Sequence, residues 1–419
     1  MCNNNLNRSQ FLKYAEIARA VSVLTLVVIL SLTECMTAVS QSPTPLPASQ
    51  TDEGTQNSIP SDQVKDHAPA SATPKDQEPD KKKTEKRGSL VIAPIPISSP
   101  AFGSGLLLIT GYVFKLNEQD KTSPPSWLGG GGVFTNNGTR GLVLGARLYF
   151  QENKYQTTMA VAKGSANLDF FGIGRIPGRA PISVPLSMDG SIFFGEIMRR
   201  TARDIFIGPR FQYRKLGAGI DGLVPPGGFE VPEIDIRSNS VALGLHVQRD
   251  LRDSTFYATK GNLFDFTADF FDQAWGSRRE YQVYKVAYNG FHEVAPRQVL
   301  AYRAMACSAN GSVPFYDLCL FGFNNDLRGY TTGEFQNRRM FAGQAEYRLE
   351  LRKRLGVAAF GGLGGVARRW GDFRSDELLP AAGAGLRFKL DKKNHINYRI
   401  DVAFGREGRT LSIGIGEAF

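Results

Sequence analysis

The sequence predicts an all-β protein, a closed antiparallel transmembrane β-barrel of sixteen strands, and three observations carry this prediction. Short segments in which apolar and polar residues alternate follow one another from about residue 90 to the C-terminus. Strand side chains point alternately to opposite faces, so each segment has an apolar and a polar face. Charged residues lie on the polar faces. An arginine facing lipid near the midplane would cost roughly 2 to 4 kcal/mol, so the charged faces must point into a wet lumen. No stretch after the N-terminus approaches the roughly 18 uninterrupted apolar residues of a membrane helix, so strands must do the spanning.

The segment from Met340 to Arg352 shows the alternation most strictly. Its two faces consist of Phe341, Ala345, Tyr347, Leu349 and Leu351 on one side and Gln344, Glu346, Arg348, Glu350 and Arg352 on the other. A soluble sandwich would seldom place four consecutive charges of mixed sign along one face of a strand. We therefore expect the first face to meet lipid and the second to meet water.

Fifteen segments carry this pattern. They are Phe102–Leu116, Trp127–Thr135, Gly141–Phe150, Tyr155–Ala166, Val184–Glu196, Ile205–Leu216, Ser238–Arg249, Gly261–Phe271, Glu280–Phe291, Gln298–Ala306, Met340–Arg352, Gly356–Ala367, Ala381–Leu390, His395–Phe404 and Thr410–Phe419. Single-chain bacterial barrels have even strand numbers, so sixteen strands are expected and one remains to be found.

The N-terminal part divides into two segments. Residues 1–40 show the order of a secretory signal, with basic residues, an apolar run from Val21 to Leu32 and small residues before a cleavage site ahead of Gln41. A membrane anchor is the alternative, but twelve helical residues span only ~18 Å. Residues 41–88 are rich in Pro, Ser and Lys, and residues 41–87 contain no Phe, Trp or Tyr, which predicts a disordered linker ahead of a barrel at residues 89–419.

The net charge of +10 does not indicate a nucleic-acid partner. Many basic residues, such as Arg387, Lys389 and Arg399, lie at alternate positions of apolar strands rather than in a basic patch. That placement suits a wet lumen better than a nucleic-acid binding surface.

No catalytic, cofactor or metal constellation emerges, and an enzyme is not expected. The histidines His246, His292 and His395 fall on separate segments, which favours structural roles over metal ligation. Cys307 and Cys319 flank the base of a long loop and, in an oxidising compartment, form either a disulfide or two unpaired thiols. A soluble all-β enzyme is a further alternative, and membrane fractionation would exclude it.

Three motifs resemble the BamA/TamA outer-membrane assembly family, also called bacterial surface antigen barrels. Leu327-Arg328-Gly329-Tyr330 is similar to that family's Val/Ile-Arg-Gly-Phe/Tyr loop and is followed by a Glu-x-Arg strand. Residues 249–261 resemble its Asp-rich turn, and residues 399–405 resemble one of its late strands. The resemblance covers roughly residues 90–419 and implies a long loop folded into the lumen.

The resemblance also implies roles for individual residues. Arg328 would pair with acidic wall residues, for which Glu346 and Asp401 are the candidates, while Gly329 would allow close backbone approach and Tyr330 would pack. Where the family carries an acid in Phe-x-Asp-x-Gly, this chain has Gly362. Nothing in residues 41–87 is expected to form polypeptide-transport-associated domains.

The resemblance implies export to the bacterial outer membrane and a part in inserting or translocating polypeptide or lipid there. The C-terminal Phe419 resembles the signal by which outer-membrane barrels are recognised for assembly. Outer-membrane lipid and client polypeptides or lipids are the implied partners, and no partner protein is identified. The alternative is a passive pore or surface antigen barrel without assembly activity.

Overall fold

The computed structural model describes residues 88–419 except residues 100–102, 121, 171–176, 179–183, 202–203, 220–235, 255–256, 324 and 392–394. The expected signal at residues 1–40 and residues 41–87 of the linker expected at residues 41–88 lie outside the described residues, and Gly88 is the first residue of a strand. Helical structure in the described part consists of short 3-10 turns, namely η2 (Gln273–Trp275), η3 (Phe315–Asp317), η4 (Trp370–Asp372) and η5 (Ser375–Glu377). None of the helices in these ranges is long and apolar enough to cross a membrane.

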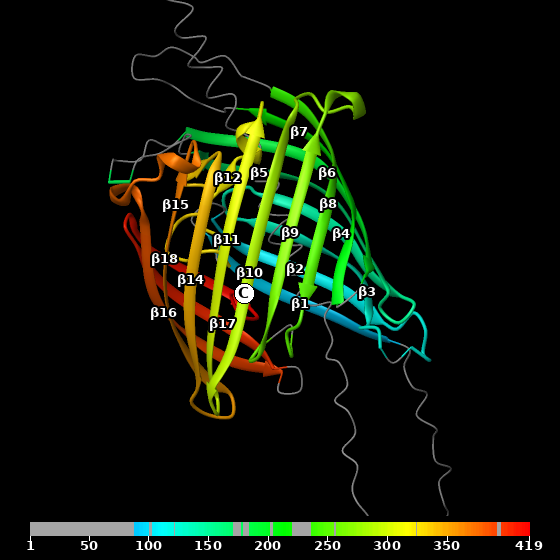
Figure 1. The fold of residues 1–419 in the computed structure, drawn as a ribbon, viewed down its shortest axis with the longest axis vertical. Coiled ribbons are helices and arrows are strands. Elements are labelled where there is room, and N and C mark those ends of the chain that lie inside the picture. The colour runs from blue at the N-terminus through cyan, green and yellow to red at the C-terminus, as the bar shows by residue number, and fades with distance from the viewer. Residues whose placement is uncertain are drawn as a thin grey trace, which may run out of the picture.

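One antiparallel sheet of sixteen strands makes up most of the described chain (Figure 1). Its strands are β1 (Gly88–Ser99), β2 (Gly103–Phe114), β3 (Ser126–Thr135), β4 (Arg140–Phe150), β5 (Tyr155–Phe170), β6 (Val184–Arg200), β7 (Ile205–Gly219), β8 (Ile236–Asp250), β9 (Gly261–Phe271), β10 (Tyr281–Ala295), β11 (Gln298–Gly311), β14 (Arg339–Glu350), β15 (Leu355–Ala367), β16 (Leu379–Asp391), β17 (Ile396–Gly405) and β18 (Gly408–Ile415). Two short strands, β12 (Cys319–Leu320) and β13 (Gln336–Asn337), pair with each other between β11 and β14.

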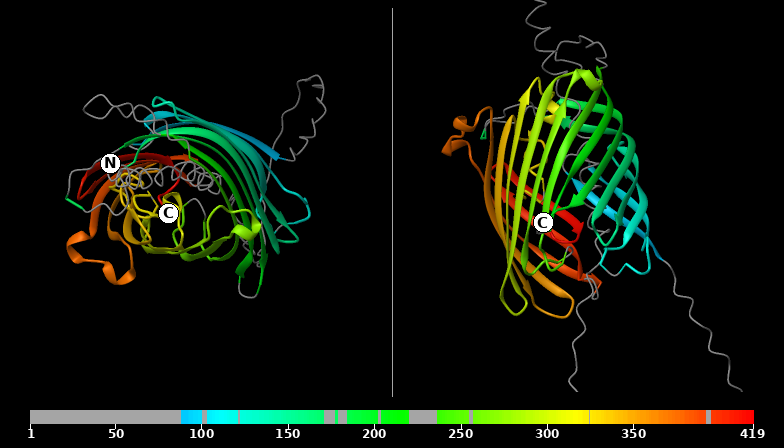
Figure 2. Two further views of the ribbon diagram at one scale, coloured as in Figure 1. Left: turned by 90° about the horizontal axis from the view of Figure 1, so that it is seen from above. Right: turned by 45° about the vertical axis from the view of Figure 1, so that its right-hand side comes forward.

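The sheet follows chain order from β1 to β18 and curves around an interior, as Figure 2 shows from above. The ladder of hydrogen bonds ends at β1 and at β18. These two edge strands lie next to each other, yet no ladder joins them among the described residues. The sequence predicts closure, and the structure brings the two edges together without pairing them.

Strand β1 is the one that the alternation pattern missed. It contains Pro94 and Pro96, which pair in register with Leu108 and Leu106 of β2. Proline has no N–H to donate and is therefore confined to edge strands whose N–H side faces away from the neighbouring strand. The same prolines remove two donors from the edge that meets β18, a physical reason why no ladder forms there.

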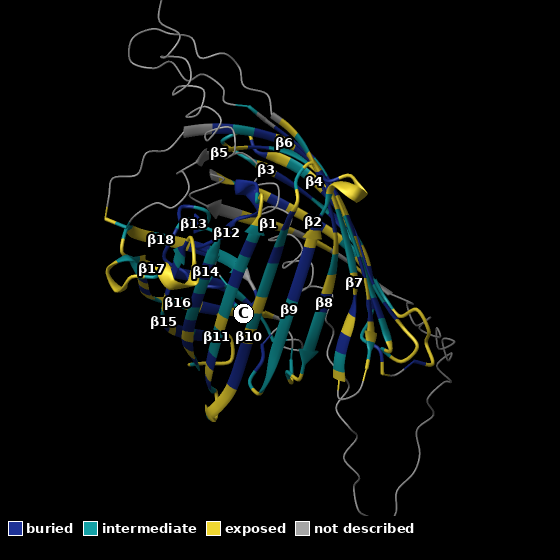
Figure 3. Ribbon diagram, turned by 45° about the horizontal axis from the view of Figure 1, so that its top comes forward, coloured by how far each residue is buried: buried dark blue, intermediate teal, exposed yellow. Residues whose placement is uncertain are grey.

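Buried and exposed residues alternate along the strands (Figure 3), and many of the buried residues are charged while the exposed ones are apolar, the reverse of a soluble protein. On β14, Glu346 is fully buried and Arg348 is 1% exposed, whereas Tyr347 between them is 39% exposed. The same inversion extends around the sheet, where exposed large apolar residues include Leu142, Leu144, Phe193, Leu243, Leu300, Leu386 and Phe404. The outer wall is therefore apolar and the inner wall is charged, as the alternation predicts.

Candidate functional site

The candidate site is built around the segment between β11 and β14, residues 312–338, which we call the lumen loop. It begins after Gly311, forms η3, pairs β12 with β13 and returns to the wall at Arg339. Its described aromatic residues pack on one another inside the curve of the sheet, with Tyr330 edge-to-face against both Phe321 and Phe335. The loop occupies the interior that the resemblance assigns to it.

Arg328 is the most enclosed charge of the lumen loop. Its Nη1 donates to Asp401 Oδ2 at 2.6 Å, and its Nη2 lies 2.6 Å from Glu346 Oε2. Nε and Nη2 both donate to Gln344 Oε1 at 3.2 Å, and the guanidinium carbon lies 3.4 Å from the centre of the Phe360 ring. The Arg328 side chain is 0% exposed. Both candidate partners named from the sequence, Glu346 and Asp401, therefore contact it.

Further arginines share these carboxylates. Arg387 donates from Nη1 to Asp401 Oδ1 at 2.6 Å and from Nε to Glu417 Oε2 at 2.7 Å. Arg348 donates from Nε to Glu346 Oε1 at 2.6 Å. Buried charges are costly unless paired, and here each carboxylate has at least two cationic neighbours. We call this set, with Arg328 and Arg399, the first anchor.

Gly329 brings the loop backbone directly onto the wall. Its φ of +114° lies in the region that favours glycine, and a Cβ there would sit 3.0 Å from the Ala381 Cβ and 3.3 Å from the Gly405 N. Tyr330 continues the contact, because its hydroxyl donates to the Pro380 carbonyl at 2.6 Å and accepts from the Arg406 N–H at 3.1 Å. The tetrapeptide thus lies against β16 and the end of β17.

Leu327 explains why Gly362 replaces the acid of the family motif. A Cβ on Gly362 would lie 2.2 Å from the Gly343 carbonyl oxygen and 2.6 Å from Leu327 Cδ1. Leu327 is buried and fills the space that an aspartate side chain would need. Gln344 and Glu346 on the neighbouring strand supply acceptors to Arg328 instead.

Gly362→Asp is therefore expected to displace Leu327 and to lower the free energy of unfolding by about 1 to 3 kcal/mol, the usual cost of overpacking. Heat-modifiable mobility on gels and protease sensitivity of the lumen loop would measure this. Gly371→Asp is the matched control, since a Cβ at Gly371 meets no atom within 4 Å. Equal behaviour of the two variants would contradict the packing argument.

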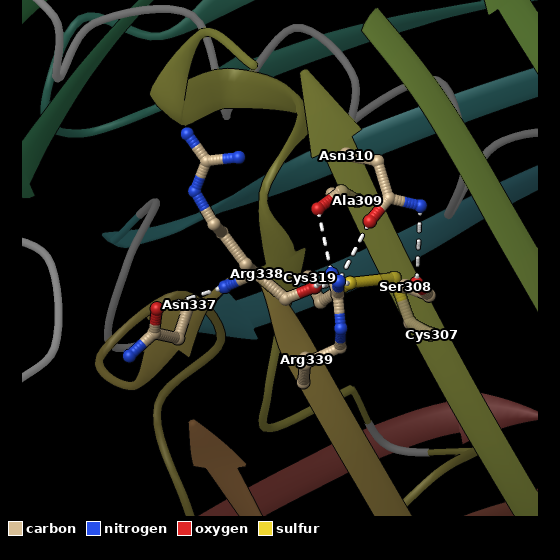
Figure 4. The surroundings of a disulfide bond; sticks show 8 residues. All are labelled: Cys307, Ser308, Ala309, Asn310, Cys319, Asn337, Arg338 and Arg339. Atoms are coloured by element: carbon tan, nitrogen blue, oxygen red, sulfur yellow. Dashed lines mark hydrogen bonds between the residues drawn. A yellow bond between two sulfur atoms is a disulfide. The ribbon is translucent and has the colours of Figure 1, made fainter. Parts of the chain in front are cut away.

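A disulfide joins Cys307 of β11 to Cys319 of β12, with the Cα atoms 5.7 Å apart (Figure 4). Next to it, the Arg339 guanidinium donates to the Ala309 carbonyl at 2.7 Å and to Asn310 Oδ1 at 2.6 Å. The base of the lumen loop is therefore tied to β11 by a covalent bond and by hydrogen bonds. The sequence left this pairing open against two free thiols.

Cys307→Ser with Cys319→Ser is expected to lower the free energy of unfolding by roughly 3 kcal/mol, because a ring of this size restricts the unfolded chain. The midpoint of heat-induced unfolding, measured with and without reductant, tests it. The double-serine variant should be insensitive to reductant, whereas the unmodified protein should shift. A reductant shift of the same size in both proteins would contradict a role for this bond.

A second contact holds the start of the lumen loop to a distant part of the sheet. Arg214 of β7 donates from Nη1 and Nη2 to the two oxygens of Asp317 in η3, at 2.7 and 2.9 Å, and the Tyr281 hydroxyl of β10 also donates to Asp317. The guanidinium carbon of Arg214 lies 4.8 Å from the centre of the Phe271 ring. We call this cluster the second anchor.

Sequence reasoning did not find the second anchor. Arg214 follows the outward-facing Tyr213 on the same strand, so the alternation places Arg214 inside. Nothing in the sequence relates Arg214 to Asp317, some hundred residues later. Arg387, Arg348 and Glu417 of the first anchor were also not singled out as partners, although the alternation placed the two arginines inward.

Phe419 lies inside the barrel wall rather than on it. Strand β18 ends at Ile415, four residues before the end predicted from the sequence. The Phe419 ring packs at 6.4 Å from Phe291, and its carbonyl oxygen accepts from Arg348 Nη2 at 3.1 Å. A role of Phe419 as an assembly signal stays a prediction.

The described side chains do not assemble a metal site, since no group of three His, Cys, Asp or Glu among them is placed to hold an ion. His246 bonds through Nδ1 with Glu196 at 2.8 Å and through Nε2 with Asp265 at 2.9 Å. These contacts link β8 to its neighbour β9 and, past β7, to β6 along the inner wall. It gives His246 a structural role of the kind expected from its isolation in the sequence.

Comparisons with known proteins agree with this geometry. A family model described as the Omp85 superfamily domain matches residues 132–419, more than half of the chain. No curated protein shows a significant sequence match.

Two solved structures share the fold. BamA from Haemophilus ducreyi lacking POTRA domains 1–3 aligns with a TM-score of 0.52 and 13% identity over 78% of this chain and 68% of that one. CdiB from Acinetobacter baumannii aligns with a TM-score of 0.50 and 11% identity over 78% of this chain and 65% of that one. At such identities the likeness concerns the fold, while the match of the family model shows that this chain belongs to the Omp85 superfamily.

Proposed function

We propose that this protein is a β-barrel of the outer membrane, exported through a cleaved signal, that acts in the insertion or translocation of polypeptide or lipid. The apolar outer wall suits lipid, and the charged inner wall suits a wet lumen. Membership of the Omp85 superfamily supports the membrane location and the class of activity.

The observation that carries the proposal is the lumen loop, held across the interior by two anchors. Arg328 fastens it to β14 and β17, and Asp317 fastens it to β7 and β10. Together these contacts reach from β7 to β17 across the sheet, so the loop braces the wall from inside. A lumen that the loop occupies is unsuited to free diffusion of solutes through the barrel. It leaves the edge strands of the sheet as the place where a client could bind.

The unpaired seam between β1 and β18 offers such an edge. An edge strand presents N–H and C=O groups that pair readily with an incoming strand. Pro94 and Pro96 on β1 leave that side poorer in donors, so β18 is the better template of the two. A client polypeptide in extended form, or a lipid passing between the edges, fits this seam.

Depletion of the protein followed by an inventory of outer-membrane proteins and lipids tests the proposal. We expect specific outer-membrane components to be lost, and re-expression of the unmodified chain to restore them. Re-expression of Arg328→Glu should not restore them, because the first anchor would be broken. An unchanged inventory after depletion would contradict a part in insertion or translocation and would favour a surface antigen barrel or pore.

A further inference from the structure

A recess on the outer wall, at the end of the barrel where the lumen loop lies, is lined by basic side chains. It has a volume of about 300 Å³ and is lined by Lys215, Arg237, Asn239, Gly276 and Arg278. We infer that this rim recess binds the phosphate groups of an anionic lipid headgroup. The inference rests on the proposed outer-membrane location and adds a ligand site to it.

The lining residues point away from the lumen. Lys215 follows the inward-facing Arg214, and Arg237 and Asn239 alternate with two serines whose hydroxyls bond the lumen-loop residue Tyr316. All three lining residues of β7 and β8 are exposed. In the register of the two strands, Lys215 of β7 lies opposite Asn239 of β8. Arg237 precedes Asn239 by two residues on β8, on the same face, and lies opposite Gly217. The two cations are thus adjacent on the outer face.

The third cation is brought to the same place by the turn between β9 and β10. The Arg278 backbone N–H donates to the Asn239 carbonyl at 3.0 Å, and its guanidinium Nη1 donates to the Arg237 carbonyl at 2.5 Å. Gly276 makes the turn with a φ of +98°. The recess is therefore formed by a turn bonded to the outside of a strand, and its three charged lining residues are all positive.

Apolar and aromatic residues place the rim recess at headgroup level. On the barrel side of the recess, the outer faces of β7 and β8 carry Tyr213, Leu243 and Leu245, which are exposed. Trp275 lies beside them, exposed on the turn, with its indole Nε1 donating to the Val241 carbonyl at 3.1 Å. Amphipathic aromatic residues mark the boundary between the hydrocarbon and the headgroups. The three cations lie beyond that boundary, where lipid phosphates are found.

The leaflet follows from the strand directions. Neighbouring strands are antiparallel, so β7 and β9 end on the same side as β11, the side of the lumen loop, whereas β1 begins and β18 ends on the other. Outer-membrane barrels have short periplasmic turns and longer extracellular loops, and the longest connection, the lumen loop, is on the side of the rim recess. For an exported chain the rim recess therefore faces the outer leaflet. Among the described residues, Asp189 of β6 also lies on this face, against Gly217, and it is not among the lining residues.

Arginine and lysine are the side chains that bind phosphate oxygens, with Arg adding a planar pair of donors. Three such cations and an amide around an open recess suit a headgroup that carries phosphate monoesters. A sugar or a zwitterionic headgroup offers these donors fewer anionic oxygens than a phosphate monoester does. Phosphate charge is therefore the feature that we expect the site to select.

Native mass spectrometry of the purified full chain with diphosphoryl lipid A tests the inference. Lys215→Gln, Arg237→Gln and Arg278→Gln combined should lower lipid retention on the order of tenfold or more, because charge-assisted hydrogen bonds are lost. The matched control combines Arg352→Gln, Lys353→Gln and Arg354→Gln, three exposed bases in the turn after β14 at the opposite end. This control should retain lipid as the unmodified chain does, and heat-modifiable mobility verifies that both variants are folded.

Three results would overturn the inference. They are equal losses in the two triple variants, which would indicate general charge attraction; undiminished binding by the rim variant; and equal binding of a dephosphorylated lipid A. Displacement of the lipid by inorganic phosphate at equal concentration would show a site for the free anion and would overturn the lipid assignment. Because the readout is binding by purified protein, its failure is distinct from failure of the depletion experiment.

Discussion

Asp317→Ala is expected to lower the free energy of unfolding by about 3 to 5 kcal/mol, the usual cost of leaving one partner of a buried ion pair alone. Asp317 is the carboxylate that meets both Nη atoms of Arg214, whose side chain is 1% exposed. Removing Asp317 leaves that guanidinium enclosed against the Phe271 and Tyr316 rings without its counter-charge. Urea-dependent unfolding in detergent or lipid vesicles measures the change.

Arg214→Met combined with Asp317→Asn is the control for this prediction. The pair of substitutions removes both charges together, and the asparagine oxygen still accepts from the Tyr281 hydroxyl. Replacing both members of a buried ion pair often leaves the free energy of unfolding unchanged. The double variant should therefore be more stable than Asp317→Ala, and a double variant as unstable as the single one would contradict the second anchor.

Arg328→Glu is expected to lower the free energy of unfolding by roughly 3 to 5 kcal/mol. Arg328→Ala should lower it by only about 1 to 3 kcal/mol. The first anchor holds four arginines, Arg328, Arg348, Arg387 and Arg399, and three carboxylates, Glu346, Asp401 and Glu417. Without Arg328, three arginines still face three carboxylates. A glutamate at this position instead sets three arginines against four buried carboxylates.

Heat-modifiable mobility and protease sensitivity of the lumen loop separate these outcomes. Arg328→Ala should keep a folded barrel with a loop that is cleaved more readily, because the wall charges stay paired. Arg328→Glu should lose the folded, fast-migrating form. Identical behaviour of the alanine and glutamate variants would show that charge balance does not govern the first anchor.

The alternation of polar and apolar residues predicts most strands of the wall and their inner and outer faces, because it depends only on residues close together in the sequence. On β14 a period of two separates Glu346 and Arg348 from Tyr347, and burial follows that period without exception across these positions. The alternation did not predict strand β1, because Pro94 and Pro96 are residues typical of loops. Proline is compatible with a strand at the edge of a sheet, which is where β1 lies.

Contacts between distant segments are beyond such local rules. Arg328 and its partners were identified through a family motif, and Gly362 became intelligible only when Leu327 was seen to fill the adjacent space. The pairing of Arg214 with Asp317 depends on how the lumen loop crosses the interior. The inward turn of Phe419 depends on Arg348 and Phe291, which lie on other strands.

Conductance in planar bilayers tests most directly the claim that the lumen loop, held by two anchors, occupies the barrel. The unmodified chain should give small or flickering conductance, and a chain carrying Arg328→Ala and Asp317→Asn should give larger and longer openings because both anchors are weakened. A large, stable and voltage-insensitive conductance from the unmodified chain would contradict the claim and would identify a passive pore.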